Sequence, residues 1–476
     1  MPKYDKILRD ALSGTRPSKE QRRKLEGLAN KTLSITKSIA KRYKAKAMLA
    51  GSITRDTWLP EKNEFDVFVL FPENVKEKQM ESAGLQVGKV VMAKLKGTHD
   101  IQYAEHPYVA GKAGNIGIDI VPCYELASTE HLKSAVDRTP FHVRYIEKKL
   151  PLSISNEVRL LKKFLASNDM YGADAKASGY SGYVCELLMI AYRSFLDVLK
   201  AAEKWEPGEV IDLEKAYTKQ DAPKLVSMFK DQPLILVDPT DRKRNTAAAV
   251  SAYNFFKFKK FAKVFLDSPS AELLLGREIK PITEAELIQW QMQRRTEVLI
   301  IKFIPPKVVP DILWPQLRKF GERLQSILEE TKYEFKVLSR DVFTDETFIA
   351  AAVLEMEVSK LPSVQKRIGP SIFDQKDSEN FLNKYKDISI GGPYTEDGAW
   401  VVEIKREFMT ARDKLVDSLS KPLDILKAKG IPNHIAERIV NGFEVFSETD
   451  RIMQIVERNK EFGVFLRKYF EKEKLV

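Results

Sequence analysis

The sequence predicts a multi-domain α+β protein. At 476 residues the chain is too long for one hydrophobic core, and its 43% hydrophobic and 30% charged residues are typical of a folded chain rather than a disordered one. Strand and helix patterns alternate over residues 1–150, helical patterns dominate residues 151–270, and both return over residues 271–420. Residues 421–476 are predicted to form a helical tail rich in paired charges. We therefore expect four domains with these boundaries.

Residues 1–150 carry the elements of a small α/β or α+β domain. Ser18-Lys19-Glu20-Gln21 is a capping-box pattern that predicts the start of a long helix. Residues 46–50 predict a strand that runs into Gly51-Ser52, and a helix start is expected after this pair. Further elements are predicted at residues 64–71 (strand), 76–94 (helix), 101–109 (strand) and 117–124 (strand).

The rest of the chain divides into a helical centre and a second α+β part. Residues 156–165 predict an amphipathic helix, and residues 179–200 predict one long apolar helix. Beyond residue 270 we expect strands at 298–303, 335–338, 348–358 and 400–404, and helices at 315–331 and 410–420.

Positive charge is concentrated at the beginning of the chain. Residues 1–50 hold 14 Lys and Arg against 4 Asp and Glu, which is +10 of a total net charge of +11. Such a region often faces the phosphates of a nucleic acid, although a solvated helix face explains the charge equally well when it is considered alone. Arg22, Arg23 and Lys24 are the candidate RNA-binding residues.

Composition argues against several other classes of protein. No apolar run approaches the ~18 residues that a membrane span needs, and the first residues lack the apolar core of a signal peptide. Cys123 and Cys185 lie in apolar segments, so we expect buried, inert thiols. The five histidines show no zinc-ligand spacing. The expected location is the cytoplasm.

The strongest functional signal is a set of acids inside apolar strands. Glu64 and Asp66 are two residues apart, so both carboxylates point to one side of a strand, and Asp119 stands alone in the apolar segment 116–122. Buried carboxylates repel one another unless a cation neutralises them, and polymerase-type sites use a pair of Mg²⁺ ions. The pattern predicts a metal-dependent phosphoryl or nucleotidyl transferase. The alternative is an edge strand with exposed acids, but the apolar residues 68–70 argue against exposure.

A second signal precedes the acidic strand. Gly51 allows a phosphate to approach the backbone, and Ser52 adds a hydroxyl donor. Arg55 could reach the same triphosphate oxygens as a charged donor. A Gly-Ser pair alone also marks many ordinary turns, so the signal depends on the acids that follow it. Beside such a site, the nucleic-acid interpretation of the basic segment is favoured over the solvated helix face.

At this point the sequence resembles the archaeal-type (class I) CCA-adding tRNA nucleotidyltransferases, and the resemblance extends over most of the chain. The segments that carry it are GSITRDTWLP (51–60), EFDVF (64–68), YAEHPY (103–108), DIVPCY (119–124), SAVDRTPFH (134–142), NEVRLLK (156–162) and VDP (237–239). The resemblance implies a polymerase β-like nucleotidyltransferase catalytic (palm) domain, a helical nucleotide- and tRNA-binding central domain, an α+β tRNA-binding body domain and a helical tail.

The same resemblance implies roles for individual residues. It makes Glu64, Asp66 and Asp119 the catalytic residues and the Mg²⁺ ligands. The residues expected to hold the nucleotide are Gly51, Ser52, Arg55, His106, His142, Lys162 and Tyr171. Judged from the residues alone, a solvated lysine, a packing histidine and a core tyrosine are the ordinary interpretations of Lys162, His142 and Tyr171.

Base choice requires a separate element. Cytosine and adenine both present an amino donor beside a ring-nitrogen acceptor, so an arginine together with an acceptor could select them over guanine and uracil. Arg244 in segment 238–245 is the candidate, and a surface turn is nearly as good an interpretation of that segment.

The implied function is template-independent addition of C, C and A to the 3′ end of tRNA, with release of pyrophosphate. The expected partners are tRNA, ATP and CTP, the expected cofactor is Mg²⁺, no membrane is involved, and a homodimer is left open. One alternative is a poly(A) polymerase or an oligoadenylate synthase, which would share the catalytic acids. An alternative of another class is a non-catalytic RNA-binding protein on a transferase fold, which has no need of three clustered acids.

Overall fold

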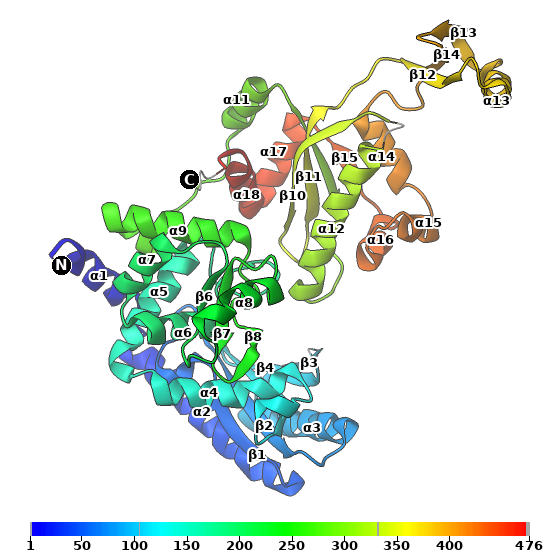
Figure 1. Cartoon of the computed structure of the whole chain (residues 1–476). Helices are drawn as coiled ribbons and strands as arrows, with labels where there is room; N and C mark the ends of the chain where they lie inside the picture. The colour runs from blue at the N-terminus through cyan, green and yellow to red at the C-terminus, as the bar shows by residue number, and fades with distance from the viewer. Residues whose placement is uncertain (1, 104, 331–332, 473–476) are drawn as a thin grey trace. The chain divides into compact units, whose positions relative to one another are not determined.

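The computed structural model describes residues 2–103, 105–330 and 333–472 (Figure 1). The chain divides into two compact units, of which the first ends at Arg277 and the second begins at Glu278. Within the described ranges, no helix combines the length and the apolar character that a membrane span requires.

A five-stranded mixed sheet forms the centre of the first unit's N-terminal part. Its strand order is β1-β2-β5-β4-β3, in which only β2 and β5 run parallel. The strands are β1 (Lys46–Ala50), β2 (Glu64–Pro72), β3 (Thr98–Tyr103), β4 (Pro107–Ala113) and β5 (Ile116–Glu125). The acidic strand β2 therefore lies between two neighbours, as its apolar residues predict, and is not an edge strand.

The two faces of this sheet are covered differently. Phe65, Val67 and Val69 of β2 point to the face covered by α2 and α3, whereas Phe68 and Leu70 point to the face where α4 packs. Glu64 and Asp66 share the second face but lie nearer the start of the strand. The helices of the unit are α1 (Pro2–Thr15), α2 (Lys19–Ala40), α3 (Glu77–Leu95), α4 (Thr139–Lys149), α5 (Ser155–Ser167), α6 (Gly182–Tyr192), α7 (Phe195–Lys204), α8 (Ala222–Met228), α9 (Ala252–Asp267) and α10 (Ala271–Leu275).

The predicted strand at 101–109 is wrong, because this segment folds as the hairpin of β3 and β4. Tyr103 pairs with Pro107 across the turn. A proline cannot donate to a ladder and starts a strand more easily than it continues one, which places the break before Pro107.

The central region contains a small sheet besides its helices. β6 (Glu209–Ile211), β7 (Leu234–Asp238) and β8 (Asp241–Asn245) form it in that order, although we predicted mostly helices here. The single helix expected over residues 179–200 is also wrong. Arg193 takes a left-handed conformation with φ 71° and ends α6, and Ser194 caps the start of α7.

The first helix belongs to this central core. Ala11 of α1 is buried with the central helices, α1 packs against α5 and α10, and Tyr4 donates a hydrogen bond to the carbonyl of Leu266. The four predicted domain boundaries stay a prediction.

The second unit contains a four-stranded antiparallel sheet of order β10-β11-β9-β15. α12 packs on β10 and β11, while α11, α17 and α18 share a second apolar core with the sheet. Its elements are α11 (Glu284–Arg294), β9 (Glu297–Phe303), α12 (Pro310–Leu328), β10 (Lys336–Thr344), β11 (Ala350–Val358), β12 (Val364–Ser371), α13 (Gln375–Tyr385), β13 (Ser389–Glu396), β14 (Ala399–Lys405), α14 (Ala411–Leu419), α15 (Leu423–Ala428), α16 (Asn433–Ile439), β15 (Glu444–Phe446), α17 (Thr449–Arg458) and α18 (Lys460–Phe470).

Three features of this unit differ from the prediction. The tail expected to be helical contributes β15, which pairs with β9. A further sheet has the order β12-β14-β13, and α13 packs on it. Of its three strands, only β14 was predicted, at residues 400–404. The helix expected at 315–331 begins earlier, at Pro310, where a proline suits the first turn of a helix.

Candidate active site

Three carboxylates meet on one face of the mixed sheet. Asp66 of β2 lies directly opposite Asp119 of β5 in the parallel register. Glu64 precedes Asp66 by two residues and therefore points to the same face. Neighbouring strands are roughly 4.8 Å apart, so the two aspartates are close enough to repel each other when both are ionised.

Burial, and after it the charges of neighbouring acids, favours the protonated forms of both aspartates. Burial, together with the charges of Asp119 and Glu64, raises the pKa of Asp66 to about 7. Burial and Glu64 raise the pKa of Asp119 to about 6. Glu64 itself is exposed, with Lys62 Nζ 3.7 Å from its carboxylate, so our expectation that the apolar strand buries both acids of β2 is wrong for this residue. A divalent cation would relieve the repulsion among the three.

Gly51 lies beside the acids. Ala50 at the end of β1 pairs with Asp66, and a Cβ added to Gly51 would lie 3.3 Å from Asp66 Oδ2. Gly51 also has φ 85°, which favours glycine. The helix start expected after this residue is only a short 3-10 helix, Ser52–Arg55, which ends at a left-handed Asp56. The chain therefore offers backbone access at this point but no α-helix N-terminus.

Arg55 and Lys162 are buried and share one carboxylate, Glu186. Arg55 Nη2 lies 2.9 Å and Nε 3.1 Å from Glu186 Oε2, and Lys162 Nζ lies 3.5 Å from Oε1. Thr57 Oγ1 donates to Glu186 Oε1 at 2.5 Å, and Lys162 Nζ donates to Thr57 O at 3.1 Å. The ordinary interpretation of Lys162 as a solvated lysine is therefore wrong.

Within this buried group, Glu186 and Lys162 each favour the ionised form of the other. Burial alone would raise the pKa of Glu186, but Lys162 and Arg55 hold it below its usual value. Burial lowers the pKa of Lys162, and Glu186 opposes that shift. Two cations balanced by one anion leave an excess of one positive charge in the buried group. An anionic ligand at its edge would be attracted to that excess.

Tyr171 lies beside this buried group. Its hydroxyl would be 3.1 Å from a Cβ added to Gly182, and Lys162 Nζ would be 3.6 Å from the same Cβ. Lys62 Nζ lies 5.3 Å from the centroid of the Tyr171 ring. Burial raises the pKa of Tyr171, and the charges of Glu186 and Glu64 add to the shift. Tyr171 is thus within electrostatic reach of both carboxylates.

His142 and Arg244 converge on a second buried acid, Asp238. His142 Nε2 and Arg244 Nη1 lie 2.8 Å and 3.0 Å from the same Asp238 oxygen, and Thr240 donates to the other oxygen at 2.8 Å. Burial opposes ionisation of Asp238, but the hydrogen bonds from His142 and Thr240 hold its pKa well below the usual value. The His142 ring stacks on Tyr183 with centroids 4.1 Å apart.

A cavity of about 900 Å³ opens beside these residues. His142, Tyr183, Ser181 and Arg244 all contribute to its wall. Arg244 is 38% exposed at its side chain, so its guanidinium is anchored at one end and accessible at the other. The cavity is lined by aromatic, hydroxyl, guanidinium, ammonium, amide and carboxylate groups, which suit a flat heterocycle with polar edges.

The structure does not bring His106 to this site. Ala110 of β4 pairs with Asp119, and His106 lies four residues before Ala110, roughly 13 Å along the chain at ~3.3 Å per residue. His106 contacts Glu77 and Glu81 of α3 instead.

Two of the three candidate RNA-binding residues of α2 are paired within the chain. Arg22 forms ion pairs with Asp56 at 2.6 Å and with Glu26 at 3.5 Å, and Lys24 pairs with Glu20 at 2.6 Å. Arg23 is exposed.

Sequence reasoning missed Glu186 and did not single out Asp238 as the anchor of His142 and Arg244. Glu186 had a signal of the same kind as Asp119, since it is a single acid in the apolar helix segment 182–190. A lone buried acid in an apolar helix requires a cation partner.

Known protein families match most of the chain. Three family models match the chain, namely the nucleotidyltransferase domain over residues 30–142, the second domain of tRNA nucleotidyltransferase over residues 156–275, and the C-terminal domain of the CCA-adding enzyme over residues 294–448. The nucleotidyltransferase fold predicted from the sequence is confirmed, and enzymes with this fold typically use divalent metal ions.

Curated relatives match over almost their whole length. The CCA-adding enzyme of Methanoregula boonei is 32% identical over 97% of this chain and 94% of that protein, and that of Methanosarcina mazei is 33% identical over 96% of each. The CCA-adding enzyme of Methanocaldococcus jannaschii is 36% identical over 81% of this chain and 85% of that protein. Among solved structures, an RNA terminal uridylyl transferase, Cid1, gives a TM-score of 0.46 at 13% identity over 58% of this chain and 98% of that one, too low to support a conclusion.

Proposed function

Since the chain belongs to the CCA-adding enzyme family, we propose that it adds C, C and A to the 3′ end of tRNA from CTP and ATP without a nucleic-acid template. Each addition joins the terminal 3′-oxygen of the tRNA to the α-phosphorus of the nucleotide. The bond from that phosphorus to the β-phosphate bridging oxygen breaks, and pyrophosphate leaves. The observation that carries the proposal is the placement of Asp66 opposite Asp119, with Glu64 on the same face.

The three carboxylates fit Mg²⁺ because they offer oxygen ligands alone. A bound pair of Mg²⁺ ions would make the 3′-hydroxyl a better nucleophile and offset charge on the departing pyrophosphate. We assign Asp119 to the ion beside the 3′-hydroxyl, and Glu64 and Asp66 to both ions. Asp66 and Asp119 must be ionised to serve as ligands, and their raised pKa values support a site that is completed by cations.

The triphosphate is assigned to Gly51 and Ser52, in front of the buried pair Arg55 and Lys162. Glu186 neutralises one of these two cations and fixes both, so the remaining positive charge is held in position before the nucleotide binds. A preorganised charge loses little free energy to reorganisation when an anion arrives.

The nucleobase is assigned to the cavity beside His142, Tyr183 and Arg244. Arg244 can donate to the ring-nitrogen acceptor that cytosine and adenine share, while Asp238 holds its guanidinium in one orientation. Arg244 cannot act as the acceptor for the exocyclic amino group, so another group of the protein or of the RNA 3′ end must supply it.

We assign tRNA binding to the second unit, the tail and the basic N-terminal segment. Duplex RNA shows little readable sequence, so contacts of this kind depend on shape and phosphate charge. Arg23, which is exposed on α2, is one candidate contact.

The proposal is tested with purified protein, Mg²⁺ and tRNA that lacks its three terminal nucleotides. Each of the four nucleotides is supplied singly and then in pairs, and the products are sequenced. CTP alone should add two residues, and CTP with ATP should add C, C and A. Long runs of A from ATP alone would identify a poly(A)-forming enzyme instead. Binding of tRNA without incorporation would identify a non-catalytic RNA-binding protein.

A further inference from the structure

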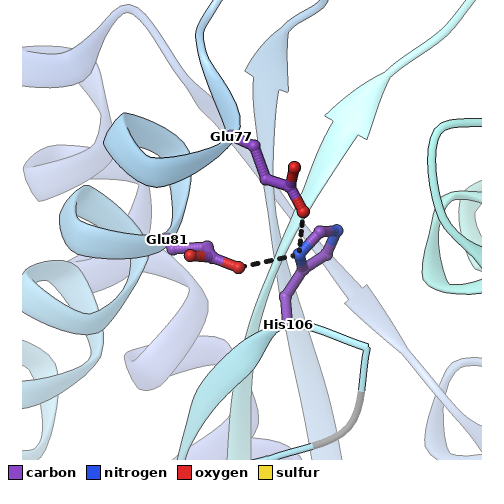
Figure 2. Close-up of side chains that lie close together, drawn as sticks. All are labelled: Glu77, Glu81 and His106. Carbon is purple, nitrogen blue, oxygen red and sulfur yellow. Dashed lines mark hydrogen bonds and ion pairs between the residues drawn. The ribbon is translucent and has the colours of Figure 1, made fainter.

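A second group of metal-binding residue types lies where α3 meets the β3–β4 turn, away from the three catalytic acids. Glu77 and Glu81 are four residues apart on α3, so they project from one face of that helix toward the turn between β3 and β4. His106 in that turn places its Nδ1 3.1 Å from Glu81 Oε1 and 3.6 Å from Glu77 Oε1 (Figure 2). One donor atom from each residue lies within 4.8 Å of the other two.

An ordinary ion pair leaves part of this arrangement unexplained. One Nδ1 proton can satisfy one carboxylate oxygen, yet two carboxylates converge on that nitrogen. The imidazole is 4% exposed, so its Nδ1 is held against the two carboxylates rather than turned to solvent.

Lys133 does not account for the negative charge either. Lys133 lines the adjoining cavity of about 620 Å³, as do Glu77 and His106. Its ammonium donates to the backbone carbonyl of Glu73 and lies 4.4 Å from the centroid of the Tyr124 ring. Lys133 is therefore occupied by other partners.

The two distances at His106 Nδ1 match a small divalent cation. An ion with ligand bonds of ~2.1 Å in tetrahedral geometry holds its donor atoms roughly 3.4 Å apart, close to the two separations measured at His106 Nδ1. An imidazole with two carboxylates suits zinc or a similar transition metal, whereas Mg²⁺ prefers oxygen ligands alone. Glu77 is 66% exposed, so an ion and a fourth ligand such as water could enter from solvent.

We propose that Glu77, Glu81 and His106 bind one zinc-class divalent ion that is separate from the catalytic metal site and ties α3 to the β3–β4 turn. The preceding residue in this turn, Glu105, accepts a hydrogen bond from the backbone of Ala135. The ion would thus fix a turn that also contacts the segment leading into α4. This inference does not depend on the proposed function.

The test uses the full chain with Asp66→Asn and Asp119→Asn, which weakens metal binding at the catalytic acids. This metal-free protein is titrated with Co²⁺ in an excess of Mg²⁺ and followed by visible absorption, and zinc retained after dialysis is measured by mass spectrometry. We expect one ion per chain and a higher melting temperature with zinc. Glu81→Gln or Glu77→Gln is then added to this variant. Loss of a hydrogen bond that only supports a metal ligand costs roughly 10–100-fold in metal affinity, and loss of a ligand carboxylate should cost more than that.

Glu73→Gln is the matched control, because it removes the same charge from the wall of the same cavity. It should leave the stoichiometry and the absorption spectrum unchanged. Glu77 is exposed, so Glu77→Gln keeps the test valid even where His106→Gln fails to fold. Absence of binding, or binding that the glutamate variants do not weaken, or an equal loss in Glu73→Gln, would overturn the proposal.

Discussion

Replacing Asp66 with asparagine should stabilise the metal-free protein at neutral and alkaline pH. The folded protein raises the pKa of this carboxyl from 3.8 to about 7 through burial and the charges of Asp119 and Glu64. The folded state therefore holds the proton more tightly than the unfolded state, and stability falls as pH rises from about 4 to about 7. At about 1.4 kcal/mol per pKa unit the full effect is about 4 kcal/mol. Partial access to water reduces the expected gain to about 2 kcal/mol.

The assay is urea unfolding of the full chain in chelator, with pulsed hydrogen exchange of the β2 and β5 amides to follow the sheet that contains Asp66. The difference between Asp66→Asn and the wild type should be close to zero near pH 4 and reach about 2 kcal/mol near pH 8. Mg²⁺ should reduce the difference at the higher pH, because it binds the folded wild type more tightly than the variant. Asp100→Asn, at an exposed acid of the same sheet, should change nothing.

A constant difference across this pH range would refute the reasoning, since it would show that Asp66 carries no proton linked to folding. A gain in Asp66→Asn that Mg²⁺ leaves intact would show that the repulsion exists but that the acids do not bind the ion.

Two further predictions concern substrate binding. Glu186→Gln should raise KM for both CTP and ATP by roughly 10-fold, about 1.4 kcal/mol, because Arg55 and Lys162 lose the anion that holds them; an unchanged KM in a folded variant would exclude this positioning role. Reversing the charges of Arg23 and Lys24 to glutamate should reduce the slope of log affinity for tRNA against log salt by about 1 to 2, and an unchanged slope would mean that neither residue contacts phosphate.

The catalytic strands could be predicted because their signal is local. The apolar residues of β2 and β5 define two buried strands, and acids in such strands are rare without a cation. The pairing that places Asp66 against Asp119 is a long-range property, however, and only the structure shows that these two strands are adjacent and in register.

Other features of the site and of the fold could not be predicted from the local sequence pattern. Arg55 was predicted to reach the triphosphate, but its buried partner Glu186 lies 131 residues away in the chain, so no local pattern links the two. The short strands β6 and β8 carry too few residues for periodicity to distinguish them from turns. The sheet of β12 to β14 is half exposed, and its mixture of polar and apolar residues gave a weak signal.

The most direct test of the central claim is single-turnover incorporation of CMP by Asp119→Asn, with tRNA affinity measured on the same preparation. If the three acids hold the reacting metal ions, tRNA affinity should stay within about 3-fold of the wild type while incorporation falls by at least roughly 1,000-fold. Normal incorporation by a variant that binds tRNA normally would contradict the account.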